Sequence, residues 1–328
     1  MMLVGRRYAP ICTVMCAVAV VLMGAAPAGA FEFKRTLSQG DSGRDVKMLQ
    51  IRMAGWYPDT GKHHFPLDGE FGPGTASAVK AFKAFHSLPA NGVANRALYR
   101  ILDGLQDPNG STKHFDFSEF TQNFNPMCGA RANSYSGTFE GGMVATARVK
   151  RNVRRLMWRL EAVRAKLGGN SVGINSGYRS VAYNDCIGGA RASQHIYGTA
   201  ADNRVANVNN RRARTIAKGS QVHGIGCYAR LSHNHFDLRM DNNDLKSTRA
   251  FWWPDRDRQG RDLDEASRPC WGEVAHTSPA RSTAATSTVS VIRAVAAAVP
   301  GAGSLIPSTA EIEAFESAGE SADLGEAD

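Results

Sequence analysis

The chain has 328 residues, of which 43% are hydrophobic and 21% are charged, and its formal net charge is +9. This length is enough for one or two domains with their own hydrophobic cores. The basic balance favours a polyanionic partner, but no sequence motif for nucleic-acid recognition accompanies it, so we expect no nucleic-acid partner.

Residues 1–30 predict a signal peptide. Arg6 and Arg7 give a positive start, residues 11–26 are almost wholly apolar, and Ala28-Gly29-Ala30 has the small-x-small pattern of a cleavage site. The apolar run is shorter than the roughly 20 residues that span a bilayer, so we expect no stable membrane anchor. Export also argues against a nucleic-acid partner.

Export also decides how the cysteines are interpreted. An even number of cysteines in an oxidising compartment favours two disulfides, and the absence of a CxxC pair disfavours a cysteine-zinc cluster. The sequence does not choose among the three possible pairings of the cysteines that remain after cleavage, which are Cys128, Cys186, Cys227 and Cys270.

Residues 37–102 form the first predicted domain. Apolar residues at helical spacing predict short helices around Val46–Met53, Val79–Phe85 and Ala97–Ile101, separated by Gly-rich turns. Thr75 stands where an N-cap of the second helix is expected. The prediction is an all-α unit of three short helices.

This unit resembles a known family. The segments Ser38-Gln39-Gly40-Asp41-Ser42-Gly43, Leu49-Gln50 and Leu67-Asp68-Gly69-Glu70-Phe71-Gly72-Pro73-Gly74-Thr75 are similar in order and spacing to the three-helix peptidoglycan-binding domain of bacterial wall hydrolases. The resemblance implies docking on wall glycopeptide without catalysis. Most of these residues serve the core or turns, so we assign no individual ligand contact.

A polar linker is predicted at residues 103–120, followed by a second domain at residues 121–272. Its clearest helix is predicted at Met143–Leu167, where one apolar stripe comprises Val149, Val153, Leu156, Leu160, Val163 and Leu167. The opposite face is rich in arginine, and we expect it to be solvated; its members are Arg151, Arg154, Arg155 and Arg159.

The segment from His233 to Arg239 predicts a ligand-bearing strand. Alternate side chains share one face of a strand, so His233, His235, Asp237 and Arg239 would point one way and the intervening apolar residues to the core. Two imidazoles and a carboxylate on one face suit a metal ion. Asp237 could orient a ligating imidazole.

A second segment supplies further ligands. His195 and Asp202 are seven residues apart with Gly198 between them, so they could converge across a loop that turns back into a strand. A catalytic zinc needs three nitrogen or oxygen ligands and an open position. These residues predict a Zn²⁺ cofactor.

The second domain also resembles a family. The pattern SxHxxGxAxD at Ser193–Asp202, preceded by Ser176-Gly177-Tyr178-Arg179 and followed by His235-x-Asp237-x-Arg239, is similar to the zinc D-Ala-D-Ala carboxypeptidases and their lysostaphin-type and hedgehog relatives. The resemblance implies an α+β hedgehog-like domain, for which we expect a small antiparallel sheet flanked by helices.

The resemblance also implies roles for single residues. It makes His195, Asp202 and His235 the zinc ligands, His233 a catalytic partner of the water at the metal, and Arg179 a stabiliser of the oxyanion. We further expect substrate-binding positions at Ser193 and Tyr178.

Two residues depart from the family pattern. Many relatives carry an acidic general base where this chain has Ser232, so the base is His233, Asp237 or a residue elsewhere, and we favour His233. Asn203 follows Asp202 where relatives usually carry an aliphatic residue, so the strand packing of the family is not expected to carry over unchanged at this position.

From His276 onward the chain is rich in Ala, Ser and Thr and then acidic, which predicts a disordered tail at residues 276–328 whose role the sequence does not give. Arg281 and Arg293 stand against seven acidic residues there, so this segment carries −5. Loss of the two signal arginines leaves about +7 on the mature chain, and thus about +12 on residues 31–276. Such a body suits anionic wall polymers.

These observations predict a secreted zinc metallopeptidase of the bacterial cell wall, acting as a monomer on the D-amino-acid bonds of peptidoglycan stem peptides. A D,D-carboxypeptidase and a D,D-endopeptidase both fit. The alternatives are an endopeptidase for the L-Ala-D-Glu bond or a cross-bridge, and a non-catalytic zinc-containing wall-binding protein. The sequence does not choose the bond.

Overall fold

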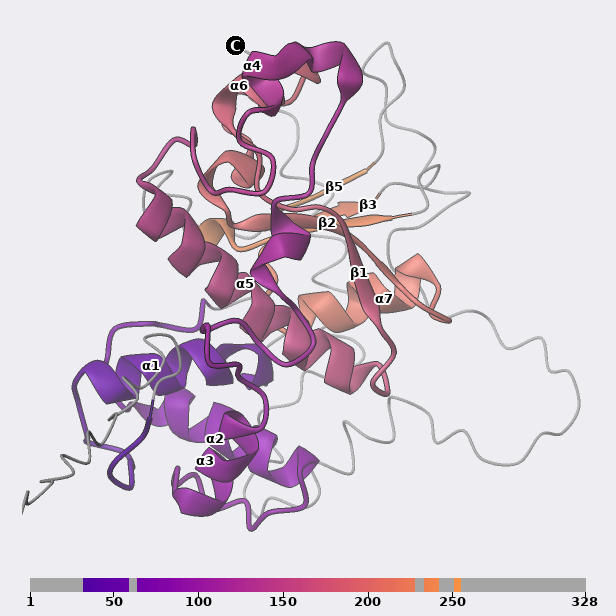
Figure 1. Ribbon diagram of the computed structural model, residues 1–328. Coiled ribbons are helices and arrows are strands. Elements are labelled where there is room, and N and C mark those ends of the chain that lie inside the picture. The colour runs from indigo at the N-terminus through magenta and orange to yellow at the C-terminus, as the bar shows by residue number, and fades with distance from the viewer. Residues whose placement is uncertain (1–31, 59–63, 228–232, 242–250, 255–328) are drawn as a thin grey trace, which may run out of the picture.

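The computed structural model describes residues 32–58, 64–227, 233–241 and 251–254 (Figure 1). The predicted signal peptide and the predicted acidic tail both lie outside these ranges. Within them, no helix is both long enough and apolar enough to cross a bilayer.

The N-terminal part is helical, as predicted. Its helices are α1 (Arg44–Met53), α2 (Pro73–Phe85) and α3 (Arg96–Asp103), with a short 3₁₀ turn, η1 (Ala54–Trp56), after α1. Apolar residues of these helices form one core, in which Val46, Leu49 and Val79 are fully buried, whereas Phe85 is exposed.

The expected N-cap at Thr75 is wrong. Helix α2 starts at Pro73 with Gly72 as its N-cap, because proline at the first helical position needs no hydrogen-bond partner for its nitrogen. Thr75 is buried inside the helix, and its hydroxyl accepts a hydrogen bond from Gln50 Nε2 at 3.2 Å. The same Gln50 amide donates to Asp68 Oδ1 at 2.8 Å and accepts from the Gly69 nitrogen at 2.8 Å. The motif glutamine therefore fixes the turn before α2.

The C-terminal part combines helices with a five-stranded sheet (Figure 1). The strands lie in the order β1-β2-β4-β3-β5, and all neighbours are antiparallel except β3 and β5. The strand bounds are β1 (Val172–Ser176), β2 (Ala200–Val205), β3 (Gly224–Cys227), β4 (Asn234–Asp237) and β5 (Phe251–Pro254). The small antiparallel sheet predicted from the sequence is therefore present, with one parallel strand added at its edge.

Two helices supply most of the core against this sheet, α5 (Thr146–Lys166) and α7 (Asn210–Lys218). The shorter elements are η2 (Phe117–Phe120), η3 (Pro126–Cys128), α4 (Gly129–Asn133), α6 (Val181–Cys186), η4 (Gln194–Tyr197) and η5 (Arg239–Asp241). A disulfide joins Cys128 to Cys186 and so ties α4 and η3 to α6; Cys227 is disulfide-bonded too. The pairing that the sequence left open is thereby partly decided.

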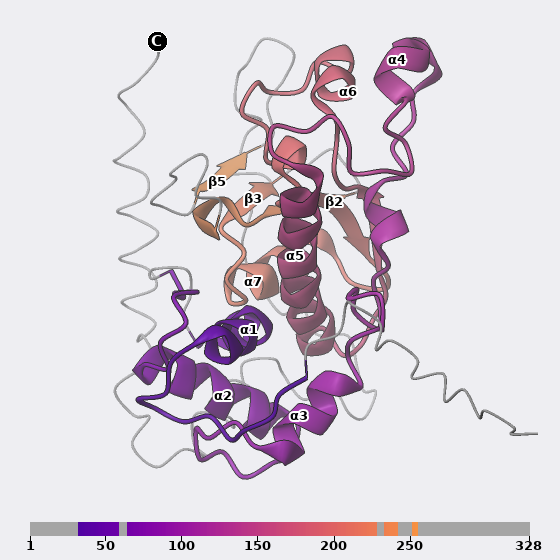
Figure 2. The same cartoon turned by 60° about the vertical axis from the view of Figure 1, so that its left-hand side comes forward.

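Helix α5 is buried on two sides. The predicted apolar stripe from Val149 to Leu167 packs into the core of the sheet, while Trp158 and Ala162 belong to the core of the N-terminal helices. Figure 2 shows α5 standing between the sheet and α1. Gly55 of η1 approaches so closely that a Cβ there would lie 2.5 Å from Ala162 Cβ.

The expected solvation of the arginine face is therefore wrong for Arg159, whose side chain is fully buried. Its Nη1 donates to the Ile51 carbonyl at 3.4 Å, its Nε to the Gln221 carbonyl at 3.3 Å, and its Nη2 to Asp241 Oδ2 at 3.1 Å. Sequence periodicity identified only one buried face of α5. It could not identify the second, because the pattern within a helix carries no information about a domain that packs against its other side.

The 103–120 segment, a linker by composition, is packed against the second domain. Phe115, Phe117 and Phe120 are buried in the core formed by the sheet and α5. Asp116 and Glu119 form a capping box that starts η2. The polar residues there make turns, and the aromatic residues between them anchor the segment.

Lys166 provides a test of the contact between the two parts. Its Nζ donates to the carbonyls of Gly55 and Gly219, both at 2.8 Å, and to Ser220 Oγ at 3.0 Å, and burial lowers the pKa of Lys166 to about 7. We expect Lys166→Met to lower the free energy of unfolding by about 1–3 kcal/mol, because buried acceptors lose their donor.

Urea denaturation at constant pH would measure this change. Lys47→Met, on the exposed side of α1, is the matched control and should change the unfolding free energy by less than about 0.5 kcal/mol. Equal effects of the two substitutions would contradict the assigned role of Lys166.

Candidate metal centre

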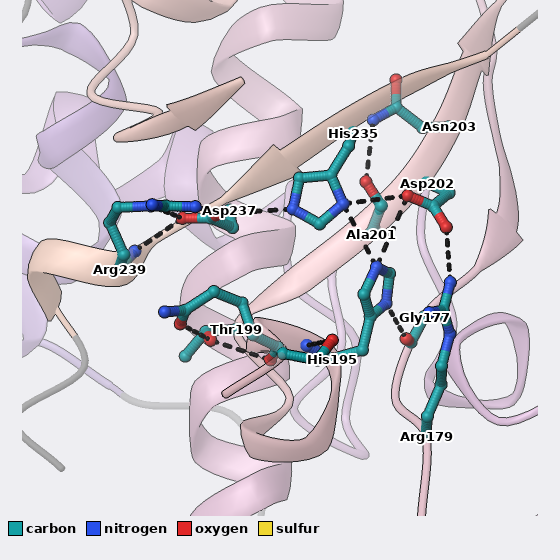
Figure 3. A network of polar contacts seen from close by, with 12 residues as sticks. Gly177, Arg179, His195, Thr199, Ala201, Asp202, Asn203, His235, Asp237 and Arg239 are labelled. Carbon is teal, nitrogen blue, oxygen red and sulfur yellow. Dashed lines mark hydrogen bonds and ion pairs between the residues drawn. The ribbon is translucent and has the colours of Figure 1, made fainter. Parts of the chain in front are cut away.

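The candidate site is built on the pairing of β2 with β4. Ala201 lies opposite Phe236 and Asp202 lies opposite His235. Because side chains alternate along strands, Ala201 and Phe236 enter the core, and Asp202 and His235 lie together on the other face. The register therefore brings a carboxylate and an imidazole side by side (Figure 3).

The second histidine comes from η4, immediately before β2. Ser193 caps this turn, with its Oγ accepting from the His195 nitrogen at 3.4 Å, and Gly198 ends it at a φ of 71°. A Cβ on Gly198 would lie 2.8 Å from Val149 Cγ1 of α5, so only glycine suits both the conformation and the space. The chain then turns directly into β2.

His195, Asp202 and His235 are all buried, and their ligand atoms converge. His195 Nε2 lies 3.2 Å from His235 Nδ1, and Asp202 Oδ1 lies 2.9 Å from His235 Nδ1 and 3.4 Å from His195 Nε2. The structure thus brings together the three residues that the sequence predicted as metal ligands.

Hydrogen bonds fix which nitrogen each imidazole presents. His195 Nδ1 donates to the Gly177 carbonyl at 2.6 Å, which leaves its Nε2 as the lone-pair atom. His235 Nε2 lies 3.2 Å from Asp237 Oδ2 and donates to it, which leaves Nδ1 for the cluster. A cation or a proton must lie between the two facing nitrogens, so the donor set fits a zinc ion.

The titration of His235 agrees with this geometry. Burial lowers the pKa of His235, but hydrogen bonds to Asp202 and Asp237 outweigh burial and raise it to about 9. Burial raises the pKa of Asp202, yet the neighbouring histidines hold that pKa well below its usual value. The pocket therefore favours positive charge between its ligands.

Asp237 orients His235 and is itself held in place. It is fully buried, Arg239 donates to its Oδ1 from Nε at 3.0 Å, and Arg239 Nη2 donates to its Oδ2 at 2.6 Å. Burial raises the pKa of Asp237, but the hydrogen bonds from His235 and Arg239 lower it far more. An ionised carboxylate behind a ligating imidazole is a common device of zinc sites.

Arg179 contacts the cluster from the other side. Its Nη2 donates to Asp202 Oδ2 at 2.7 Å and its Nε donates to Ser176 Oγ at 3.0 Å. Asp202 Oδ2 therefore accepts a hydrogen bond from Arg179, and Asp202 Oδ1 faces the two histidines.

His233 lies directly before β4 and is half-buried. Burial lowers the pKa of His233, and the charge of Asp202 opposes this shift. His233 therefore lies within electrostatic range of Asp202. Ser232 lies outside the described residues.

Tyr178, expected at a substrate-binding position, packs in the core. Its side chain is fully buried, its hydroxyl donates to the Glu140 carbonyl at 2.6 Å, and its ring packs edge-on against Tyr135. Tyr178 therefore belongs to the core, while the side chain of the neighbouring Arg179 reaches Asp202. Ser193, also expected to bind substrate, is half-buried and caps η4.

Sequence reasoning missed Gly224. Gly224, Ile225 and Gly226 form part of β3, and Gly224 lies opposite Asp237 in the ladder. A Cβ on Gly224 would overlap the Asp237 carboxylate. Glycine in a strand marks a close approach, and that signal was present in the sequence.

Asn203 is accommodated within the sheet. It is fully buried opposite Asn234, and its Nδ2 donates to the Ala201 carbonyl at 3.2 Å. Its Oδ1 has no hydrogen-bond partner among the described residues. The β2–β4 pairing continues through Asn203, whereas the β1–β2 ladder is irregular beside it, because Ile174 pairs with Asn203 and Ser176 pairs with Asp202. The pairing of Asp202 with His235 is kept.

Two imidazoles and a carboxylate, with a second carboxylate behind one imidazole, are the arrangement of a mononuclear zinc hydrolase. Comparison with known proteins gives the family. Residues 131–237 match the family described as Peptidase M15, and residues 42–102 match a peptidoglycan binding domain.

Two relatives agree with these matches. The chain is 37% identical over 201 residues to the zinc D-Ala-D-Ala carboxypeptidase of Streptomyces albus G, which covers 60% of this chain and 73% of that protein. It is 38% identical over 69 residues to the N-acetylmuramoyl-L-alanine amidase CwlL of Bacillus licheniformis, covering 20% of this chain and 18% of the amidase. The chain belongs to the M15 peptidase family, as its motifs predicted, and is a metallopeptidase with a peptidoglycan-binding domain.

Gly224 provides a test of the site. We expect Gly224→Ala to displace the Asp237 carboxylate and to lower zinc affinity or activity by about 10- to 100-fold, the usual cost of losing a group that orients a ligand. Zinc competition titration would measure the affinity.

Gly173→Ala is the matched control, since Gly173 lies on β1 of the same sheet and a Cβ added there would meet no atom within 4 Å. It should bind zinc as the unchanged protein does. Normal zinc affinity in Gly224→Ala would contradict the role of Asp237.

Proposed function

We propose that this metallopeptidase hydrolyses D-amino-acid bonds of peptidoglycan stem peptides, either releasing the terminal D-Ala or cutting a D,D cross-link. The observation that carries the proposal is the convergence of His195, Asp202 and His235, with Arg179 on the free oxygen of Asp202. The name of the carboxypeptidase relative supports the choice of bond. Zinc is the ion that the family and the donor set imply.

The remaining assignments concern location and organisation. Residues 1–30 direct export, and the enzyme works as a monomer in the cell wall. Residues 37–102 are a three-helix domain that docks on peptidoglycan, and residues 121–272 are a catalytic domain with a hedgehog-like fold. The matches to a peptidoglycan binding domain and to an amidase of a bacterial wall support this location. The basic charge adds attraction to anionic wall polymers.

Each residue of the site has a separate task. His195 Nε2, His235 Nδ1 and one oxygen of Asp202 would hold the ion. Zinc bound there would polarise the scissile carbonyl and lower the pKa of a water molecule toward neutral pH. Asp237 and Arg239 keep the His235 ring from rotating.

Arg179 stabilises the oxyanion that develops at the scissile carbonyl. Its bonds to Asp202 and Ser176 use two of the five N–H donors of a guanidinium, so donors remain for the substrate. A fixed donor of this kind is worth about 10²- to 10³-fold in kcat.

His233 is the general base. Asp237 is the competing candidate, but it is fully buried and both of its oxygens are engaged by Arg239 and His235. His233 is half-buried, and its lowered pKa keeps the imidazole neutral and able to accept a proton near pH 7.

The proposal is tested by incubating the zinc-loaded protein with a purified pentapeptide-bearing muropeptide and identifying the products by mass spectrometry. We expect loss of one terminal Ala, and no product from a zinc-stripped sample or from His235→Ala. Cleavage only in cross-linked dimers would make the enzyme a D,D-endopeptidase. Cleavage between L-Ala and D-Glu, or no cleavage of any muropeptide by protein that holds zinc, would overturn the proposal.

Arg179→Met separates catalysis from metal binding. We expect kcat to fall about 10²- to 10³-fold, because an oxyanion donor is lost, while the zinc content stays unchanged. Steady-state kinetics and elemental analysis would measure the two quantities. Arg151→Met, an exposed change on α5, is the control and should leave both unchanged. Loss of zinc from Arg179→Met would show instead that Arg179 mainly holds Asp202.

A further inference from the structure

A second cluster of two histidines and an aspartate lies where the two parts of the chain meet. His64 precedes α2, His223 precedes β3, and Asp241 ends η5. One ligand atom from each lies within 4.8 Å of the others. His64 Nε2 lies 2.5 Å from Asp241 Oδ1, and the rings of His64 and His223 are 5.1 Å apart. These residues are separate from the catalytic cluster.

The second cluster repeats the design of the first. In the catalytic cluster, Asp202 places one oxygen on Arg179 and the other toward histidines. In the second, Asp241 places Oδ2 on Arg159 at 3.1 Å and Oδ1 toward His64. An arginine on one oxygen orients the other oxygen for a ligand.

An ion pair between His64 and Asp241 does not explain why His223 is buried beside them. Its side chain is 2% exposed, and neither ring nitrogen has a hydrogen-bond partner among the described residues. A buried polar group without a partner is unfavourable. A neutral imidazole carries a lone pair on one of its two ring nitrogens. A cation beside His64 and Asp241 would give one of the His223 ring nitrogens a partner.

We propose that His64, His223 and Asp241 form a second zinc site, which joins the N-terminal helices to the sheet domain. Two imidazoles and one carboxylate are donors that zinc prefers, with a fourth position left for water. His64 comes from the N-terminal part, and His223 and Asp241 come from the part that holds the sheet. Zinc at this place stabilises the contact between them, because it binds the folded arrangement and not the unfolded chain.

The test uses the full chain with the catalytic ligands removed, as His195→Ala/His235→Ala. We expect two zinc ions per molecule in the unchanged protein, one in this double variant, and none when His64→Gln is added. The His64 side chain is 31% exposed, so its replacement leaves the folded core intact. His223→Asn added to the double variant should likewise abolish binding, and circular dichroism would verify folding. Elemental analysis after dialysis measures the stoichiometry.

His86→Gln in the same double variant is the matched control. His86 also lies beside the contact with α5, and its Nε2 has no partner among the described residues, but no ligand cluster found in that part of the chain contains it. It should retain one zinc. A double variant that binds no zinc would overturn the proposal, and so would zinc binding that survives both His64→Gln and His223→Asn.

A second readout separates this proposal from the catalytic one. Zinc should raise the melting temperature of the His195→Ala/His235→Ala variant, and adding His64→Gln should abolish that rise. His64→Gln alone should retain one zinc and cleave the muropeptide at the unchanged rate. Zinc stoichiometry therefore tests the second site even if muropeptide cleavage fails, and cleavage tests the catalytic site even if the second site is absent.

Discussion

The burial of α5 on two sides is the constraint on which the rest of the structure depends. One face of this helix completes the core of the sheet, and the other completes the core of the N-terminal helices. Two polar side chains at this boundary, the buried Arg159 and the half-buried Lys166, have hydrogen-bond partners in both parts. The position of the helix therefore fixes η4 and β2 on one side and η1 on the other.

The candidate metal centre follows from that framework through short-range constraints. Close packing of Gly198 on α5 sets where η4 ends, and the β2–β4 register sets where Asp202 meets His235. The missing side chain of Gly224 leaves space for the Asp237 carboxylate. These glycines thus constrain the site as strictly as the ligands do, since a side chain at either position would overlap atoms that position the ligands.

The sequence was sufficient for features that depend on local periodicity and residue type. The stripe from Val149 to Leu167 and the set His195, Asp202 and His235 were both predicted. Features that depend on distant partners were not, because no pattern within a helix reveals a second domain behind it. Arg159 was expected in solvent for this reason, and the burial of Tyr178 was not expected, because a motif does not tell which of its residues faces the core.

The shared helix has a consequence for movement along the wall. A binding domain on a flexible tether would let its enzyme search all bonds within reach of one attachment point. Here the 103–120 segment is packed and α5 belongs to both cores, so the two parts form one packed unit. With the proposed function, such an enzyme would meet bonds at a set offset from its attachment, and it would have to release the wall before it reached the next one.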